Sequence, residues 1–122
     1  MPKKKILVVD DEKNFTHLVK LALSPYEILE ENDSMHAIEA ARQFQPDLIL
    51  LDIIMPGMDG SELATQMRAD PLLQHTPIVF LTAIISPTET SGGATEIGGF
   101  PVLAKPVNKL TLIECIEKHL PG

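Results

Sequence analysis

The chain has little of what secreted and membrane-spanning proteins depend on. Its 122 residues include one cysteine and no tryptophan, and only 4% of them are aromatic. A single cysteine cannot form an internal disulfide, which favours a reducing compartment. No apolar run approaches the roughly 20 residues that cross a bilayer, and the N-terminus has no signal-peptide core. We therefore expect a cytoplasmic protein that does not contact the membrane.

Positive charge is also scarce. Lys and Arg number 10 against 17 Asp and Glu, which gives a formal net charge of -7. A surface that neutralises nucleic-acid phosphates needs clustered Lys and Arg, so we expect no direct binding to nucleic acid. The one basic run, Lys3 to Lys5, fits a solvated approach to a strand better than a nucleic-acid arm. Cys115 lies in a helix-like stretch, where packing is a simpler role than catalysis.

Short apolar runs alternate with helix-length segments along the chain. Continuous apolar runs of this length are typical of strands covered on both faces, and hence of a parallel sheet. The runs are Lys5 to Val9, Leu48 to Leu51, Ile78 to Leu81 and Pro101 to Ala104, with a weaker run, Tyr26 to Leu29, expected at the sheet edge. Five strands alternating with five helices predict a doubly wound α/β fold with helices on both faces of the sheet.

Apolar residues recur at helical spacing between these runs. The expected stripes are Phe15, Leu18 and Ala22; Ala37, Ile38, Ala41 and Phe44; Leu63 and Met67; and Leu112, Ile113, Ile116 and Leu120. The prolines that follow Ser24, Gln45, Asp70 and Leu120 are expected to end helices. The segment Ser86 to Gly99, where a fourth helix belongs, contains Gly92 and Gly93. Each interior glycine costs a helix about 1 kcal/mol relative to alanine, so we expect this helix to be weak, short or mobile.

Polar residues gather at the carboxyl ends of the predicted strands. If the strand order is 2-1-3-4-5, the order reverses between the first and third strands, where ligands bind in such sheets. Asp10 and Asp11 follow the first strand, and Asp52 ends the third. Carboxylates this close repel one another unless a cation lies among them, and oxygen ligands of this kind suit Mg²⁺. Thr82, at the end of the fourth strand, and Lys105, after the fifth, join the same edge.

Taken in order, these motifs resemble the receiver domain of two-component response regulators, of which the chemotaxis regulators are an example. The motifs are VVDD after the first strand, LLDIIMPGMDG after the third, LTA after the fourth and KP after the fifth. The resemblance covers residues 1–122 as a single receiver domain. It implies a flavodoxin-like fold with a five-stranded parallel sheet of order 2-1-3-4-5.

The resemblance also implies a role for each residue at the acidic edge. Asp52 matches the phospho-accepting aspartate, which attacks a phosphohistidine of a sensor histidine kinase or a phosphotransfer protein. Asp11 matches the direct Mg²⁺ ligand, and Asp10 its partner, which works through water. The backbone carbonyl of Ile54 is expected to supply a further ligand.

The remaining implied roles concern the response to phosphorylation. Thr82 matches the hydroxyl that bonds a phosphoryl oxygen and shifts on activation. Lys105 matches the lysine that pairs with the phosphoryl group, and the bond to Pro106 is expected to be cis. The signal is expected to reach a downstream effector through the fourth helix, fifth strand and fifth helix. Val102 stands where the family carries a Tyr or Phe, and the nearest aromatic is Phe100, so we expect the readout to differ from the usual coupling.

Other functions for the same residues are less consistent with the sequence. A pseudo-receiver, used as a constitutive protein-interaction module, would be expected to lose some members of a set that is intact here: Asp10, Asp11, Asp52, Thr82 and Lys105. A phosphatase of the haloacid dehalogenase type needs a second Asp two residues after the nucleophile, where Ile54 stands. A dinucleotide-binding protein would carry G-x-G-x-x-G after its first strand, and this chain does not. We expect no enzymatic activity beyond the chain's own phosphorylation and dephosphorylation.

Local structure accounts for several other polar residues. Asp59 with Gly60 is expected to make the turn before the third helix, and capping of the first helix is the alternative role for Asp11. The four histidines have spacings that make no metal pair, so we expect them at the surface or in packing. They are His17, His36, His75 and His119.

Overall fold

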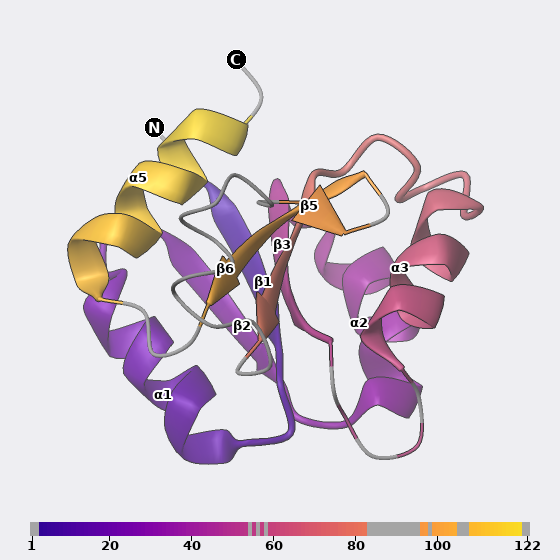
Figure 1. Ribbon diagram of the computed structural model, residues 1–122, viewed down its shortest axis with the longest axis horizontal. Coiled ribbons are helices and arrows are strands. Elements are labelled where there is room, and N and C mark those ends of the chain that lie inside the picture. Colours follow the sequence, from indigo (N-terminus) through magenta and orange to yellow (C-terminus); the bar gives the residue numbers. More distant parts are fainter. Residues whose placement is uncertain are drawn as a thin grey trace.

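A β-sheet lies between two layers of helices. The computed structural model describes residues 3–53, 55, 57, 59–82, 96–97, 99–104 and 108–120. The strands of this part of the chain are β1 (Lys5–Val9), β2 (Glu27–Glu31), β3 (Leu48–Asp52), β4 (Ile78–Thr82), β5 (Glu96–Ile97) and β6 (Phe100–Ala104). The helices are α1 (Lys13–Ala22), α2 (Ala37–Phe44), α3 (Gly60–Arg68) and α5 (Lys109–His119), with a 3₁₀ turn at Ser34–His36 before α2. Figure 1 shows α1 and α5 on one side of the sheet and α2 and α3 on the other.

The strands pair in the order β2-β1-β3-β4-β6-β5. All neighbours from β2 to β6 are parallel, whereas β5 is antiparallel to β6. The five parallel strands therefore have the predicted order 2-1-3-4-5, and the doubly wound fold is confirmed. β2 lies at the edge of the sheet, as its weaker apolar run predicted.

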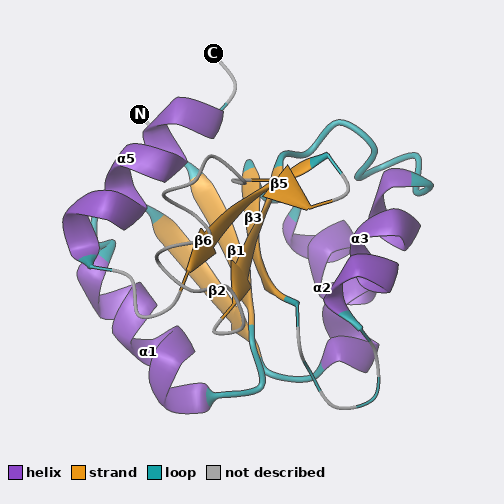
Figure 2. Ribbon diagram, in the orientation of Figure 1, coloured by secondary structure: helices purple, strands orange, loops and turns teal. Residues whose placement is uncertain are grey.

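Successive residues of each strand pack on opposite faces of the sheet, which divides the core in two. The core on the α1 and α5 side contains Ile6, Val8, Val19, Leu23, Ile28, Leu48, Leu50, Val79, Leu81, Leu112 and Ile116. The core on the α2 and α3 side contains Leu7, Val9, Ala37, Ala41, Ile49, Leu51, Leu63, Ala64, Met67, Ile78, Phe80 and Val102, among others. Because helices cover both faces (Figure 2), the central strands are apolar except at their ends, where β1 begins with Lys5, β3 ends with Asp52 and β4 ends with Thr82.

The apolar stripe predicted for α1 is wrong at one position. Leu18 is 64% exposed, and the buried residues of the helix are Thr16 and Val19. A threonine can face the sheet here because its hydroxyl donates to Glu30 and accepts from Asn32, both on or next to β2. The buried face of α1 thus combines apolar residues, Val19 and Phe15, with a threonine whose hydroxyl has polar partners. The stripes predicted for α2, α3 and α5 are confirmed.

Most of the segment expected to hold a weak fourth helix, Ser86 to Gly99, lies outside the described residues. Its described end is a strand: Glu96 and Ile97 form β5, and Ile97 pairs with Phe100 of β6. Gly99, in the turn between the two strands, has a φ of 87°, a backbone conformation that glycine adopts readily.

Each described helix ends shortly before a proline. The four described helices end at Ala22, Phe44, Arg68 and His119, in each case one or two residues before the residue that precedes a proline. The ring of a proline disfavours helical backbone in the residue before it, which explains the agreement. In the described part of the chain, no helix has the length and apolar character needed to cross a membrane.

Candidate functional site

The three predicted carboxylates meet at one edge of the sheet. β1 and β3 are parallel neighbours with Val9 opposite Leu51, so the next residues along the two strands, Asp10 and Asp52, lie side by side. One oxygen from each of Asp10, Asp11 and Asp52 lies within 4.8 Å of the others. Asp10 and Asp52 are buried and Asp11 is exposed. Among the described residues, this is the one group of three or more acidic, histidine or cysteine side chains close enough to hold a metal ion.

Asp10 is fixed by hydrogen bonds on three sides. Its amide donates to the carbonyl of Glu31 at 3.1 Å, which extends the pairing of β1 with β2 by one residue. Its carboxylate oxygen Oδ1 accepts from the amide of Glu12 at 2.9 Å, and its carbonyl accepts from the side-chain amide of Asn32 at 2.8 Å. The side chain is fully buried. Such a residue has few rotamers available, so the position of its carboxylate is set by the fold.

Asp11 does not cap α1. The cap position is Glu12, whose side chain makes no capping hydrogen bond. Asp11 is exposed beside the two buried carboxylates, and the capping alternative finds no support in this geometry. The role of Asp11 that agrees with the structure is therefore as a member of the acidic group with Asp10 and Asp52.

Thr82 lies on the strand next to Asp52. In the register of β3 with β4, Asp52 is opposite Leu81, and the amide of Ile53 donates to the carbonyl of Leu81 at 3.1 Å. Thr82 is therefore directly beyond the partner of Asp52, and it is fully buried. Hydroxyl and carboxylate come from neighbouring strand ends, as the sequence predicted.

Two predicted site residues, Lys105 and Ile54, lie outside the described residues, and so does Pro106. Val102, which stands where a receiver carries an aromatic, is buried in the core on the α3 side. Phe100 packs against that core, with its ring centroid 5.2 Å from that of Phe80. The aromatic residue of β6 is thus Phe100, two residues before the position of Val102 and on the same face of the strand.

The sequence alone did not single out Gly60 as part of the site. A Cβ at Gly60 would lie 2.3 Å from the carbonyl oxygen of Asp52, a distance that no real side chain tolerates. Asp59 has the predicted turn role: its carboxylate caps α3 by accepting from the amide and hydroxyl of Ser61 at 2.8 and 2.9 Å. The Ser61 amide, followed by its hydroxyl, lowers the pKa of Asp59. Asp59 alone provides the helix cap, so the glycine that follows it was not needed for capping. Its presence at the first position of α3 could have indicated that the helix lies close to the backbone of β3.

Asn32 and Thr16 were also missed. The side-chain amide of Asn32 contacts both the Asp10 carbonyl and the Thr16 hydroxyl. Asn32 follows the predicted edge strand by three residues, and extending that strand's alternation to it would have placed it over α1. The apolar run that predicts this strand ends at Leu29, whereas β2 continues to Glu31, so the apolar pattern does not reach Asn32.

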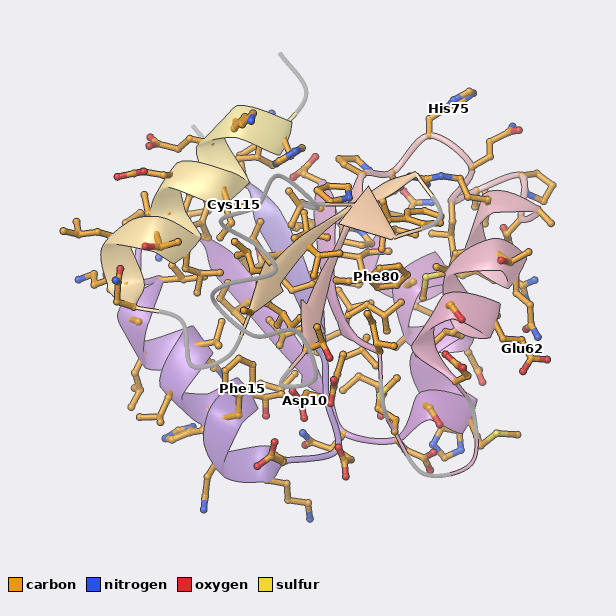
Figure 3. All side chains as sticks on the ribbon, in the orientation of Figure 1. Asp10, Phe15, Glu62, His75, Phe80 and Cys115 are labelled. Atoms are coloured by element: carbon orange, nitrogen blue, oxygen red, sulfur yellow. The ribbon has the colours of Figure 1, made fainter. Side chains whose placement is uncertain are left out.

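The histidines and Cys115 lie apart from the acidic group. Figure 3 shows His75 and Cys115 toward the opposite edge of the sheet from Asp10. His17 lies 3.8 Å from Glu30 and His36 lies 3.3 Å from Asp33, both on the surface. Burial raises the pKa of the Cys115 thiol, and the side chain packs against the core on the α5 side. This fits the structural role predicted for them.

Comparison with known proteins identifies the family. The profile of the response regulator receiver domain matches residues 6–117, and the chain belongs to that family. It is 36% identical over 110 residues to the response regulator PleD of Caulobacter vibrioides, covering 88% of this chain and 24% of PleD. The chain thus spans about a quarter of the length of that relative.

Solved structures agree with the fold. The chemotaxis protein CheY4 of Vibrio cholerae has a TM-score of 0.82 and 31% identity, covering 97% of this chain and 99% of that one. The receiver domain of the sensor histidine kinase PA1611 from Pseudomonas aeruginosa PAO1 has a TM-score of 0.81 and 24% identity, covering 96% and 97%. That structure contains a magnesium ion coordinated in its active-site cleft.

Proposed function

We propose that this receiver domain, taken as one domain over residues 1–122, accepts a phosphoryl group on Asp52 in the cytoplasm. The donor is the phosphohistidine of a sensor histidine kinase or a phosphotransfer protein. The observation that carries the proposal is the meeting of Asp10, Asp11 and Asp52 within 4.8 Å at the point where the strand order reverses. A helix cap or a surface ion pair needs one carboxylate, whereas a metal-assisted phosphoryl acceptor needs several together.

The donor set suits Mg²⁺. All three side chains are carboxylates, and hard oxygen ligands that leave room for water are what this ion prefers. Asp11 would contact the ion directly and Asp10 through water, and Asp52 and the carbonyl of Ile54 would complete the protein ligands. When bound, Mg²⁺ neutralises charge on the transferring phosphoryl group.

The chain's own residues divide the chemistry among them. A carboxylate oxygen of Asp52 attacks phosphorus in line with the phosphohistidine P–N bond. The O–P bond forms as the P–N bond breaks, and the imidazole nitrogen keeps the electron pair. Thr82, on the neighbouring strand, would donate its hydroxyl proton to a phosphoryl oxygen, and the ammonium of Lys105 would pair with the same group. The domain thereby catalyses only its own phosphorylation and the later hydrolysis.

The proposed output is a change at the surface formed by the fourth helix, β6 and α5, which a downstream effector protein or domain would read. Val102 is already buried in the core. The aromatic change that usually accompanies movement of the threonine is therefore replaced by another rearrangement of β6, with Phe100 as its aromatic.

The test is phosphorylation by acetyl phosphate in the presence of Mg²⁺, followed by intact mass spectrometry. The parent should gain one phosphoryl group that hydroxylamine removes, and Asp52→Asn should gain none. Asp59→Asn is the matched control, because Asp59 is an exposed aspartate seven residues along the chain and asparagine also caps helices. It should label like the parent. Labelling of Asp52→Asn would refute the nucleophile, and an unlabelled parent would favour a pseudo-receiver that acts as a constitutive interaction module.

A further inference from the structure

A chain of hydrogen bonds links the acidic site to helix α1 through the end of β2. Alternate residues of β2 face α1, and Ile28 is buried in the core on that side. Glu30 and Asn32 continue the alternation. Both have polar side chains, and both form a hydrogen bond with the hydroxyl of Thr16 in α1. We call these three residues, Asn32, Thr16 and Glu30, the Asn32 network.

The direction of the bonds from Asn32 follows from the groups involved. The Asp10 carbonyl can only accept, so the Asn32 atom 2.8 Å from it is the amide nitrogen. The same nitrogen lies 3.0 Å from the hydroxyl oxygen of Thr16, which therefore accepts its second proton. The Thr16 hydroxyl in turn has two acceptors for its one proton, a carboxylate oxygen of Glu30 at 2.8 Å and the Lys13 carbonyl at 3.1 Å. Thr16 is fully buried, so water does not replace these partners.

We propose that Asn32 is a positioning residue for the acidic site, because its amide holds the backbone from which Asp10 and Asp11 project. This inference rests on the proposed Mg²⁺-dependent function of that site. Asn32 contacts neither Asp11 nor Asp52 in any hydrogen bond of the described residues, so it acts through the Asp10 carbonyl.

The connection from β1 to α1 explains why this bond matters. The Asp10 amide is held by Glu31 and its carboxylate by the Glu12 amide. The Asp10 carbonyl begins the peptide that leads to Asp11, and its partner is the Asn32 amide. Without that partner the peptide can rotate, and the exposed carboxylate of Asp11 loses its fixed direction toward Asp52. Small rotations matter because Mg²⁺ demands near-ideal geometry from its ligands.

The size of the effect follows from residues that orient metal ligands in other sites. Removing such a partner costs 10- to 100-fold in metal affinity or activity. Asn32 is one residue removed from the proposed direct ligand, so we expect the low end, a rise of about tenfold in the dissociation constant for Mg²⁺. Thr16→Val keeps the shape of the side chain and the bond from Asn32 to Asp10. It removes the second acceptor of the Asn32 amide, together with the hydroxyl that donates to Glu30, and we expect a smaller loss of the same sign.

The experiment is a calorimetric titration with Mg²⁺ alone of the full chain, for the parent, Asn32→Ala, Thr16→Val and Asn108→Ala. Asn108 is the matched control: its side chain accepts from the Thr111 amide at 2.7 Å at the start of α5, and the substitution also deletes an asparagine bond to backbone. Circular dichroism checks that each variant is folded. The expected order of affinity is parent and Asn108→Ala together, then Thr16→Val, then Asn32→Ala.

A second measurement separates positioning from general destabilisation. The rate of phosphorylation by acetyl phosphate, measured against Mg²⁺ concentration, should shift to higher Mg²⁺ in Asn32→Ala and approach the parent rate at saturation. Parent-like affinity in folded Asn32→Ala and Thr16→Val would overturn the proposal, as would an equal loss in Asn108→Ala. If Asn32→Ala does not fold, the Mg²⁺ affinity of Thr16→Val alone tests the proposal. A parent that binds no Mg²⁺ would overturn the proposed function itself, and the inference with it.

Discussion

Gly60 lies directly against the backbone that carries Asp52. A Cβ at Gly60 would be 2.3 Å from the Asp52 carbonyl oxygen and 2.6 Å from the Cα of Ile53. The Gly60 amide donates to the Ile53 carbonyl at 2.7 Å, so the first turn of α3 is held beside the end of β3. A methyl group enters this space only if backbone moves, and that backbone directs the Asp52 carboxylate.

Gly60→Ala is therefore expected to lower the free energy of unfolding by about 3 kcal/mol, near the upper end for forcing a methyl group into packed space. The same displacement should slow phosphorylation of Asp52. Gly99→Ala is the control, because nothing lies within 4 Å of a Cβ there and only the positive φ of 87° opposes the substitution. Its cost should be about 1 kcal/mol. Urea denaturation of both variants measures the difference, and equal losses would contradict the close approach.

The buried carboxylate of Asp70 predicts a pH dependence of stability. The Leu72 amide donates to Oδ1 at 2.9 Å, and Nε of Arg42 donates to Oδ2 at 2.5 Å. The Leu72 amide first, and then Arg42, hold the pKa of Asp70 below its ordinary value against the opposing effect of burial. A lowered pKa in the folded state favours folding above the unfolded pKa, and the contribution is lost as the pH falls through the folded pKa.

Asp70→Asn should therefore lower the melting temperature at neutral pH, because the charge that Arg42 pairs with is gone. The difference in melting temperature between variant and parent should become smaller as the pH falls below about 3.9, the pKa of an unperturbed aspartate. Thermal denaturation across this range checks the sign. If the difference in melting temperature does not change with pH, the charge of Asp70 does not contribute to stability, and the side chain stabilises the fold through packing alone.

The N-cap of α5 gives a prediction that is independent of the acidic site. The Asn108 side chain accepts from the Thr111 amide, which would otherwise lack a partner in the first turn. Asn108→Ala should cost about 1 kcal/mol in the free energy of unfolding, and Asn108→Ser should recover most of it. Urea denaturation of the pair is the measurement. Equal stabilities for the two variants would show that this cap contributes nothing.

The sheet could be predicted because its signal is local and repeated. Continuous apolar runs such as Leu48 to Leu51 are what doubly covered strands require, and prolines such as Pro46 mark where helices stop. The order of the parallel strands followed from the family's motifs at their carboxyl ends. Asp10, Asp11 and Asp52 could be placed together because residues that end neighbouring parallel strands must be neighbours.

What the sequence did not show depends on contacts between distant residues. Thr16 is buried in place of Leu18 because Glu30 and Asn32, on a different element, satisfy its hydroxyl. Helical periodicity counts apolar residues and has no means of detecting such a partner. Gly60 was similarly taken for a turn residue, because its importance comes from how closely α3 approaches β3 rather than from its own φ.

The last prediction concerns the stability cost of the acidic site. Asp10, Asp11 and Asp52 place three carboxylates within 4.8 Å of one another. Two unit charges at about 4 Å repel by about 1 kcal/mol in water and more where water is excluded. Asp11 is the exposed member, so it can be changed without opening a cavity. Asp11→Asn keeps the size of the side chain and removes its charge.

Without Mg²⁺, Asp11→Asn should be more stable than the parent by about 1 kcal/mol. Adding Mg²⁺ should reverse the order, because a ligand that binds only the folded state stabilises it by RT ln(1 + [L]/Kd), and the variant binds the ion weakly. Melting temperatures measured in EDTA and in excess Mg²⁺ give the four values needed. Asp59→Asn, which removes an exposed carboxylate outside the group, should respond to Mg²⁺ as the parent does. If Asp11→Asn is less stable than the parent in EDTA, Asp11 supports the fold by itself, and repulsion within the acidic group is not what its charge contributes.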